Sequence, residues 1–296
     1  MANQQTQSVA DQHTKLAKEL QDVKLYIDGK FVEAEDNGTF ENISPFTNET
    51  MNNIASGQAA DIDKAVKAAH KAFKGEWGKM KQSERLDYVY KIGDLIEEYV
   101  EEIALLEALD TGLPLSQTKK QVSRSANNFR FYADTVKSQM YGETYQVDDE
   151  FINYTVRTPV GVAGLITPWN APFMLETWKI APALATGNTV VLKPAEWSPL
   201  TANRMAEIID QAGLPDGVFN IVHGFGETAG DALVKHKDVK LISFTGETTT
   251  GSTIMKNGAD TLKRFSMELG GKSPFIVFED ADLDSAVEGV VDPVNA

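Results

Sequence analysis

The chain has 296 residues and a formal net charge of −15, and 42% of its residues are hydrophobic, which suffices for one or two domains with buried cores. An acidic surface repels nucleic acid and anionic membranes, so we expect neither as a partner. The sequence has no cysteine, which excludes disulfides and a cysteine nucleophile within these residues. Its four histidines lack metal-ligand spacing, so no metal is expected.

No stretch of the chain reaches the roughly 18 apolar residues that a membrane span needs. Residues 1–22 lack both the apolar core of a signal peptide and the arginine-rich character of a transit peptide. We therefore predict a cytoplasmic protein whose residues 1–22 form a disordered or loose arm.

The first 140 residues predict mainly a layer of helices. Residues 24–32 indicate a small hairpin that turns at Asp28-Gly29, and residues 43–48 indicate a loop. Apolar spacing predicts one helix from Asp61, a long helix from residue 83 to residue 112, and a third from about residue 116 to residue 138. We assign three arginines of this region to the surface or to ion pairs: Arg85, Arg124 and Arg130.

Residues 142–158 predict a projecting antiparallel ribbon. Residues 151–157 alternate apolar and polar side chains, as in a strand with one solvated face. An exposed ribbon of this kind can pair with another subunit, so we expect oligomerisation through it.

From Pro159 onward the pattern changes to alternating strands and helices. Strands are expected at 160–166, 189–192, 218–222, 239–244 and 265–269, separated by helices at 173–186, 199–213, 226–236 and 249–258. Residues 274–278 form a further apolar run, and Asp282 caps a last short helix that Pro293 would break. The pattern predicts an α/β fold with an open, parallel, Rossmann-like sheet, whose ligands bind at the carboxyl ends of the strands.

Two glycine-containing stretches follow the last two of these strands. Residues 244–251 indicate a strand, a turn at Gly246 and a helix start whose free N–H groups suit a phosphate. Glu268 stands at the end of a strand, before two glycines. The two stretches together suggest a general base near a nucleotide. The alternatives are that the first is a common strand–glycine–helix turn and that Glu268 is simply an exposed glutamate.

Other strand ends carry further candidates. Lys193 and Glu196 could grip the hydroxyls of a ribose, with Glu196 repelling a 2′-phosphate and so favouring NAD over NADP, or form a surface ion pair. Residues 224–229 match G-x-G-x-x-A but follow the third strand, so a simple glycine loop is favoured. Asn170 could donate to an oxyanion, Trp169 is assigned to packing, and Lys179 faces either the site or solvent.

Four stretches, taken in this order, resemble the NAD(P)-dependent aldehyde dehydrogenase family: Pro168-Trp-Asn170, Lys193-Pro-Ala-Glu196, Phe244-Thr-Gly246 with Gly251, and Glu268-Leu-Gly-Gly-Lys-Ser-Pro274. The resemblance runs from about residue 24 to about residue 289. The sequence around Glu196 and Glu247 is most similar to the semialdehyde-oxidising branch, including enzymes of hydroxymuconic semialdehyde type.

The resemblance implies oxidation of an aldehyde or semialdehyde by NAD to a carboxylic acid and NADH. A cysteine thiolate attacks the aldehyde, Asn170 holds the oxyanion, and Glu268 activates water, with Lys179 as a third catalytic candidate. It also implies a set of cofactor-binding residues: Thr167, Pro168, Trp169, Lys193, Glu196, Gly226, Phe244, Thr245, Gly246, Glu247, Gly251 and Leu269.

Two departures from the family pattern stand out. Glu247 replaces the usual serine, which places a carboxylate beside the expected pyrophosphate. The family's cysteine lies a little beyond Ala296, so residues 23–141 and 159–270 are expected to form the NAD-binding domain and residues 271–296 only the start of a catalytic domain. The expected function is the NAD-binding half of an aldehyde dehydrogenase, inactive alone. The alternatives are a nucleotide-binding or interaction module without catalysis, and one half of a split enzyme completed by a second chain.

Overall fold

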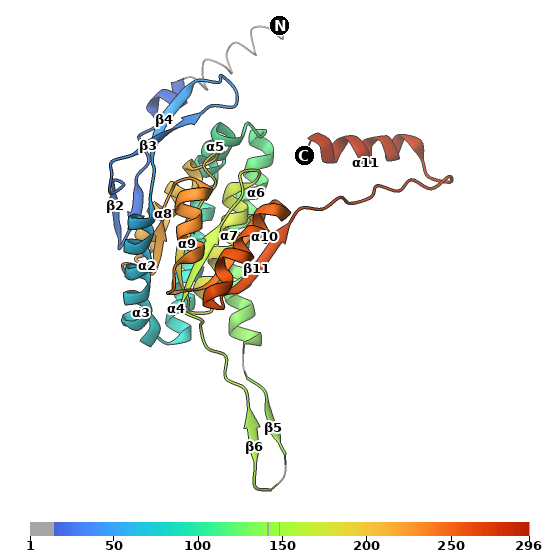
Figure 1. Ribbon diagram of the computed structural model, residues 1–296. Coiled ribbons are helices and arrows are strands. Elements are labelled where there is room, and N and C mark those ends of the chain that lie inside the picture. The colour runs from blue at the N-terminus through green and yellow to red at the C-terminus, as the bar shows by residue number, and fades with distance from the viewer. Residues whose placement is uncertain (1–14, 141, 148, 296) are drawn as a thin grey trace.

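A seven-stranded sheet forms the centre of the computed structural model, which describes residues 15–140, 142–147 and 149–295 (Figure 1). The strand order is β11-β10-β7-β8-β9-β1-β2. Five neighbouring strands run parallel: β7 (Val162–Ile166), β8 (Thr189–Lys193), β9 (Phe219–Ile221), β10 (Val239–Gly246) and β11 (Arg264–Leu269). The predicted α/β fold with an open, mostly parallel sheet is confirmed.

The sheet is mixed, because the N-terminal hairpin extends it. β1 (Leu25–Ile27) pairs antiparallel with β9 and with β2 (Lys30–Val32), and the turn between β1 and β2 is the predicted Asp28-Gly29, both with positive φ. All three residues of β1 are buried, so the apolar side chains of the hairpin complete the core at this edge.

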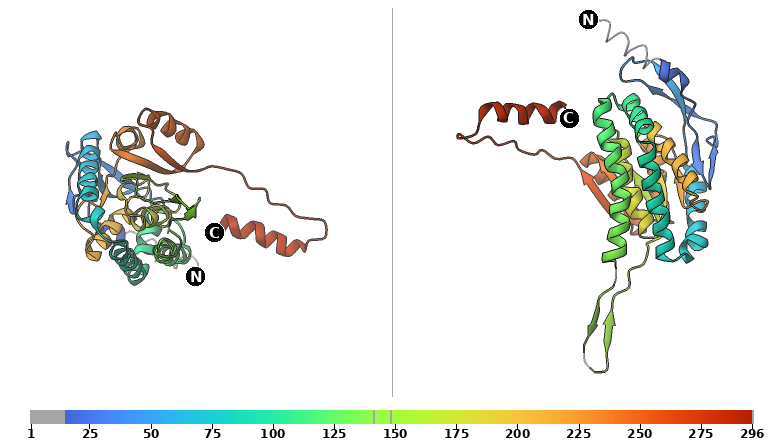
Figure 2. Two further views of the ribbon diagram at one scale, coloured as in Figure 1. Left: turned by 90° about the horizontal axis from the view of Figure 1, so that it is seen from below. Right: turned by 180° about the vertical axis from the view of Figure 1, so that it is seen from behind.

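Helices cover both faces of the sheet (Figure 2). On one face lie α2 (Ala59–Lys74), the π-helix η1 (Gly226–Gly230) continuing into α9 (Asp231–Lys235), and α10 (Thr248–Gly258), which is followed by the short η2 (Ala259–Thr261). On the other face lie α7 (Pro172–Ala185) and α8 (Leu200–Ala212). Gly164 of β7 allows close packing, since a Cβ there would lie 2.7 Å from Ile242 Cδ1.

Three further helices form an outer layer over α7 and α8: α4 (Gln82–Glu98), α5 (Val100–Thr111) and α6 (Leu115–Gln139), preceded by the short α3 (Glu76–Lys79). The prediction of one long helix over residues 83–112 is wrong, because the backbone leaves helical geometry at Tyr99 (φ −101°, ψ 18°). The helix over 116–138 is confirmed as α6.

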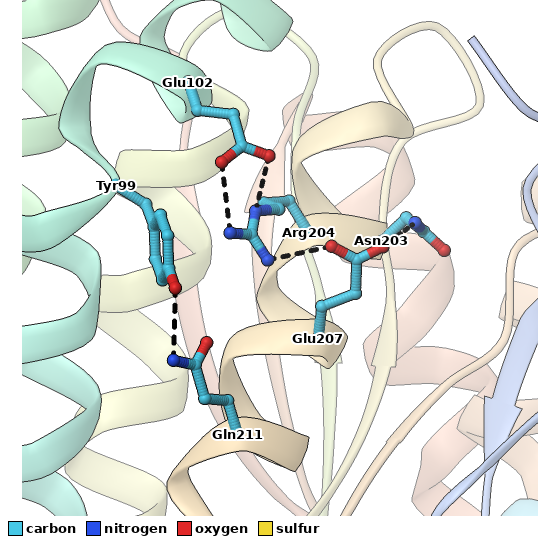
Figure 3. A network of polar contacts seen from close by, with 6 residues as sticks. All are labelled: Tyr99, Glu102, Asn203, Arg204, Glu207 and Gln211. Atoms are coloured by element: carbon cyan, nitrogen blue, oxygen red, sulfur yellow. Dashed lines mark hydrogen bonds and ion pairs between the residues drawn. The ribbon is translucent and has the colours of Figure 1, made fainter.

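A polar network joins α5 to α8 (Figure 3). The guanidinium of Arg204 on α8 contacts Glu102 at 3.0 Å and Glu207 at 2.8 Å, and it lies 4.3 Å from the ring centre of Tyr99. Gln211 donates to the Tyr99 hydroxyl at 3.1 Å. These contacts connect α5 of the outer helical layer to α8, which lies directly on the sheet.

Two features near the N-terminus differ from expectation. β3 (Thr39–Ile43) and β4 (Thr50–Ala55) form a hairpin around the predicted loop, which turns at Asn48 with φ 58°. Residues 15–19 are helical, and Leu16 and Leu20 pack against a buried cluster that includes Ile54. Residues 15–22 are therefore not a loose arm, because a helical turn places their apolar side chains on one face; residues 1–14 lie outside the described residues.

The predicted ribbon consists of β5 (Thr144–Gln146) and β6 (Ile152–Tyr154), which project away from the body of the molecule (Figure 1). The second strand is shorter than the predicted 151–157, and both of its faces are exposed, with Ile152 at 67% and Tyr154 at 69%. A role of this ribbon in oligomerisation stays a prediction.

The chain after β11 leaves the sheet. Residues 270–282 form no helix or strand, and α11 (Leu283–Asn295) follows at a distance from the body (Figures 1 and 2). Asp282 caps α11 as predicted, accepting a hydrogen bond from the Ser285 amide at 2.8 Å. The prediction that Pro293 breaks this helix is wrong, since a proline in the last turn removes one backbone hydrogen bond and the helix continues to Asn295.

Candidate functional site

The position of the site follows from the order of the strands in the sheet. The chain passes from β7 outward to β8 and β9, then crosses back to β10 on the other side of β7. The loops after β7 and β10 therefore leave in opposite directions and open a crevice between their carboxyl ends. Two adjoining cavities of about 990 and 710 Å³ lie there and share the wall formed by Pro168, Trp169 and residues 245–247.

The smaller cavity brings together the strand ends of β7, β8 and β10 and the start of η1. Lys193 is buried to 3% exposure, and its Nζ donates to Glu196 Oε2 at 2.8 Å. The pair is therefore a feature of the cavity and not the alternative, a surface ion pair. The predicted residues that line this cavity are Thr167, Pro168, Trp169, Lys193, Glu196, Gly226, Phe244, Thr245, Gly246 and Glu247.

The first two turns of α10 form one wall of the smaller cavity through Thr249, Thr250 and Thr253. Glu247 precedes this helix without a side-chain capping bond, so the N–H groups of the first turn have no capping side chain. The exposed Glu247 carboxylate lies at this positive helix end, where it would compete with a bound anion.

Gly251 does not line either cavity, unlike the other residues predicted from the same motif. A Cβ at this position would lie 2.6 Å from Leu269 Cδ2. The glycine lets α10 pack closely on β11, and its contact with a cofactor stays a prediction.

The larger cavity holds the predicted catalytic side chains Asn170, Lys179 and Glu268, and Leu269 lies in its wall. Lys179 faces the cavity and not solvent: it is 7% exposed, and its Nζ donates to Ser243 Oγ at 3.0 Å. Burial lowers the pKa of Lys179 to about 8, although the nearby Glu268 carboxylate acts in the opposite direction. A poorly solvated cation thus lies beside a carboxylate.

Trp169 is exposed to 62% and borders both cavities, so the assignment of this side chain to packing is wrong. The ring follows β7 directly, at the point where the two cavities meet. A strand-end loop over an open crevice offers no interior surface on which the indole could pack.

Arg124 of α6 is exposed, as the sequence predicts. Its guanidinium lies 5.5 Å from the ring centre of Trp178, which borders the larger cavity, and it forms no ion pair within the described residues. Arg130, by contrast, pairs with Asp94 and Glu97 as expected. Helical spacing indicates the position of Arg124 near α7. Arg124 and Asn128 lie one turn apart on α6, and Asn128 donates to Thr177 of α7 at 3.0 Å.

The residues of the smaller cavity suit a nucleotide. The Thr167 hydroxyl is buried there and has no hydrogen-bond partner among the described residues, and no side chain lies within 4 Å of the Cβ position of Gly226. An unused donor, an open glycine, a cation–carboxylate pair and a helix N-terminus are the groups that ribose and phosphate require. Within residues 15–140, 142–147 and 149–295, no His, Asp and Glu side chains group to hold a metal, and no helix is long and apolar enough to cross a bilayer.

An open α/β sheet with such a cavity at its switch point defines a nucleotide-binding fold of the dehydrogenase type. The model of the family described as "Aldehyde dehydrogenase family" matches residues 31–294. The chain belongs to the aldehyde dehydrogenase family.

Relatives and solved structures agree with this assignment. The chain is 50% identical over 270 residues to 5-carboxymethyl-2-hydroxymuconate semialdehyde dehydrogenase of Escherichia coli, covering 91% of this chain and 56% of that protein. It superposes on HpcC from Thermus thermophilus with TM-score 0.89 at 51% identity, covering 94% of this chain and 54% of that one. An NAD+ complex of aldehyde dehydrogenase from Bacillus cereus matches with TM-score 0.88 at 45% identity, covering 90% and 55%. The chain thus spans about half the length of these proteins.

Replacing Lys179 with methionine is expected to stabilise the protein at neutral pH. Because the pKa of Lys179 is about 8 against an ordinary 10.5, the unfolded chain binds more protons between these values, and stability is lost as pH falls through this window. At pH 7 the burial of the charged Lys179 lowers the free energy of unfolding by about 3 kcal/mol. The methionine variant regains this amount less about 1 kcal/mol, because it loses the hydrogen bond to Ser243. Thermal unfolding should show a higher midpoint for Lys179→Met at pH 7 and a shrinking gain toward pH 10, with exposed Lys120→Met unchanged. A lower midpoint at pH 7 would contradict this expectation.

Proposed function

We propose that this chain is the NAD-binding half of an aldehyde dehydrogenase. The observation that carries the proposal is the Lys193–Glu196 pair, held at 2.8 Å at the edge of a cavity on the switch point of the sheet. Glu196 is partly exposed and can accept hydrogen bonds from two ribose hydroxyls, whereas a 2′-phosphate would meet its negative charge. These properties support NAD as the preferred cofactor.

The larger cavity supplies groups for the chemistry on an aldehyde. Asn170 has an amide that can donate to the carbonyl oxygen as charge develops there, and Glu268 can accept a proton from water. The amine of Lys179 lies close enough to Glu268 for the two side chains to interact electrostatically. NAD held in the smaller cavity would supply a nicotinamide as hydride acceptor.

Arg124 supports a semialdehyde, that is, an aldehyde with a carboxylate at its other end. It stacks on Trp178 at the border of the larger cavity, and it has no acidic partner in the described residues although the chain carries 43 acidic residues against 28 basic ones. A guanidinium left unpaired in so acidic a chain suits a carboxylate ligand. One relative at 44% identity is named 2-hydroxymuconic semialdehyde dehydrogenase, from Pseudomonas sp. (strain CF600).

A second candidate function is one half of an enzyme completed by another chain. The segment after β11 exposes a run of large apolar side chains: Phe275, Ile276, Val277, Phe278, Leu283, Val287, Val290 and Val291. An apolar surface of this extent suits a protein partner, and the projecting ribbon β5–β6 offers a second contact for one. A complementing chain or a second copy would contribute at both places.

NAD binding is expected to depend on Glu196. In isothermal titration calorimetry, Glu196→Ala should weaken NAD binding about tenfold or more, because a hydrogen bond to a charged group contributes roughly 1.5–3 kcal/mol. The exposed Glu98→Ala should bind like the wild type. Equal affinity of the wild type and Glu196→Ala for NAD would argue against this site.

The chain alone is expected to produce no NADH from NAD and a panel of aldehydes. The family reaction passes through a thioester, and the sequence holds no cysteine to form it. Absorbance of NADH is the readout. Sustained NADH formation by the purified chain would overturn the proposal of inactivity.

Replacing Arg124 with methionine is expected to affect only carboxylated ligands. By NMR titration in the presence of NAD, binding of a four-carbon aldehyde with a terminal carboxylate should weaken about tenfold, since a charge-assisted pair is lost. Binding of uncharged butanal should stay the same. An equal loss for both ligands would assign Arg124 to the support of Trp178 and not to recognition.

A further inference from the structure

Three carboxyl groups are buried between α5 and α7, behind the wall of the larger cavity. Glu107 and Asp110 lie one turn apart on α5, and Glu176 lies on α7, three residues before Lys179. Glu107 and Glu176 are fully buried, and Asp110 is exposed to only 4%. Like charges in a place without water repel strongly, so the group cannot hold three negative charges.

The hydrogen bonds divide the three carboxyls into two kinds. Asp110 accepts the Asn42 side-chain N–H at 2.9 Å and the Leu200 amide at 2.7 Å, one on each oxygen. The four oxygens of Glu107 and Glu176 have no partner at hydrogen-bond geometry among the described residues. Asp110 is therefore equipped to carry a charge, whereas Glu107 and Glu176 are not.

No cation compensates the two glutamates within the described part of the chain. The charged groups that act on Glu176 are Glu107 and Asp110. Most basic side chains on the elements that pack around α5 and α7, and on α7 itself, are engaged elsewhere: Arg85 with the Met80 carbonyl, Lys91 with the Ala212 carbonyl, Lys119 with Glu101, Arg124 with the Trp178 ring, Arg130 with Asp94 and Glu97, Lys179 with Ser243, Lys193 with Glu196, and Arg204 with Glu102 and Glu207. Lys120 and Lys137 of α6 are exposed. A metal is not the missing partner either, because the described residues hold no metal-binding group.

The pKa values of the three carboxyl groups agree with this division. Burial raises the pKa of Asp110 to about 7, against the effect of its Asn42 and Leu200 donors. Burial and the Asp110 charge raise the pKa of Glu107 to about 8, partly offset by the nearby Phe173 amide in the first turn of α7. Burial, followed by the charges of Glu107 and Asp110, raises the pKa of Glu176 well above its ordinary value. Asp110 thus ionises first, and the glutamates keep their protons at neutral pH.

We propose that Glu107 and Glu176 are a pair of neutral, proton-carrying carboxyl groups buried between α5 and α7, and that loss of these protons at alkaline pH loosens this contact. α7 begins directly after the Asn170 loop and carries Lys179 one turn beyond Glu176. The protonation of the two glutamates therefore influences the positions of Asn170 and Lys179 in the larger cavity. The pair acts on folding, so its test needs no cofactor or substrate.

The first test is thermal unfolding between pH 6 and pH 9.5. Groups with a raised folded-state pKa keep protons that the unfolded chain releases, so they lose stability as pH rises through the folded-state pKa. The midpoint of the wild type should fall with pH relative to that of Glu176→Gln, which cannot ionise, because the opposite contribution of Lys179 is present in both proteins. At pH 8.5 the variant should melt about 3 °C or more above the wild type. The exposed Glu98→Gln should follow the wild type. Parallel curves for the wild type and Glu176→Gln, or a lower midpoint of the variant at every pH, would overturn the proposal.

The second test detects the protons directly. At pH 7 the infrared spectrum of the wild type should contain the carbonyl band of a buried protonated carboxylic acid, which shifts in heavy water and is weaker above pH 9 than at pH 7. The band should shrink in Glu176→Gln and in Glu107→Gln and persist in Glu98→Gln. Tryptophan emission should change over the same pH range in the wild type and stay flat in Glu176→Gln, since Trp178 lies on α7. If both variants fail to fold, the wild-type band decides alone: its absence at pH 7 overturns the proposal.

Discussion

The reversal of strand order between β7 and β10 is the constraint on which the site depends. Because β8 and β9 lie on one side of β7 and β10 on the other, the chain segments that follow β7 and β10 diverge over opposite faces of the sheet. No single loop can fill the space between them. Both cavities open there, and strand-end residues such as Thr167, Lys193 and Thr245 face a common space although they lie far apart along the chain.

Helix α7 transmits this constraint to the side chains of the larger cavity. It starts after Asn170, aims Lys179 into the cavity and, with Trp178, gives Arg124 its stacking surface. On its other side it packs against α6, and the buried Glu176 lies near Glu107 of α5. Charge is arranged unevenly around this helix: Lys179 has Glu268 nearby, whereas Glu176 meets only carboxyls. The protonation of these groups and the stability of the helix are therefore linked.

Much of the site could be predicted, because the relevant residues follow strands directly. Lys193, Glu196, Thr245 and Gly246 are strand-end residues, and parallel strands bring their carboxyl ends to one edge. The packing of Gly251 on Leu269 could not be predicted, because a glycine in a helix start can serve a ligand or a packing contact and the neighbour in question lies on another element. The exposure of Arg124 could be predicted, but its contact with Trp178 could not, because a helix far from the sheet strands gives no local sign of the element it packs against.

The sequence by itself determined the alternation of strands and helices, the parallel sheet, the hairpin turn at Asp28-Gly29 and the family, since these depend on local periodicity, turn residues and motif order. Only the tertiary structure decided the break at Tyr99, the addition of β1 and β2 to the sheet edge, and the burial of Glu107 and Glu176 against each other's helix. These features arise from contacts between segments distant in sequence. Their energies depend on which neighbours exclude water and which donors are within reach, and neither is encoded in a local pattern.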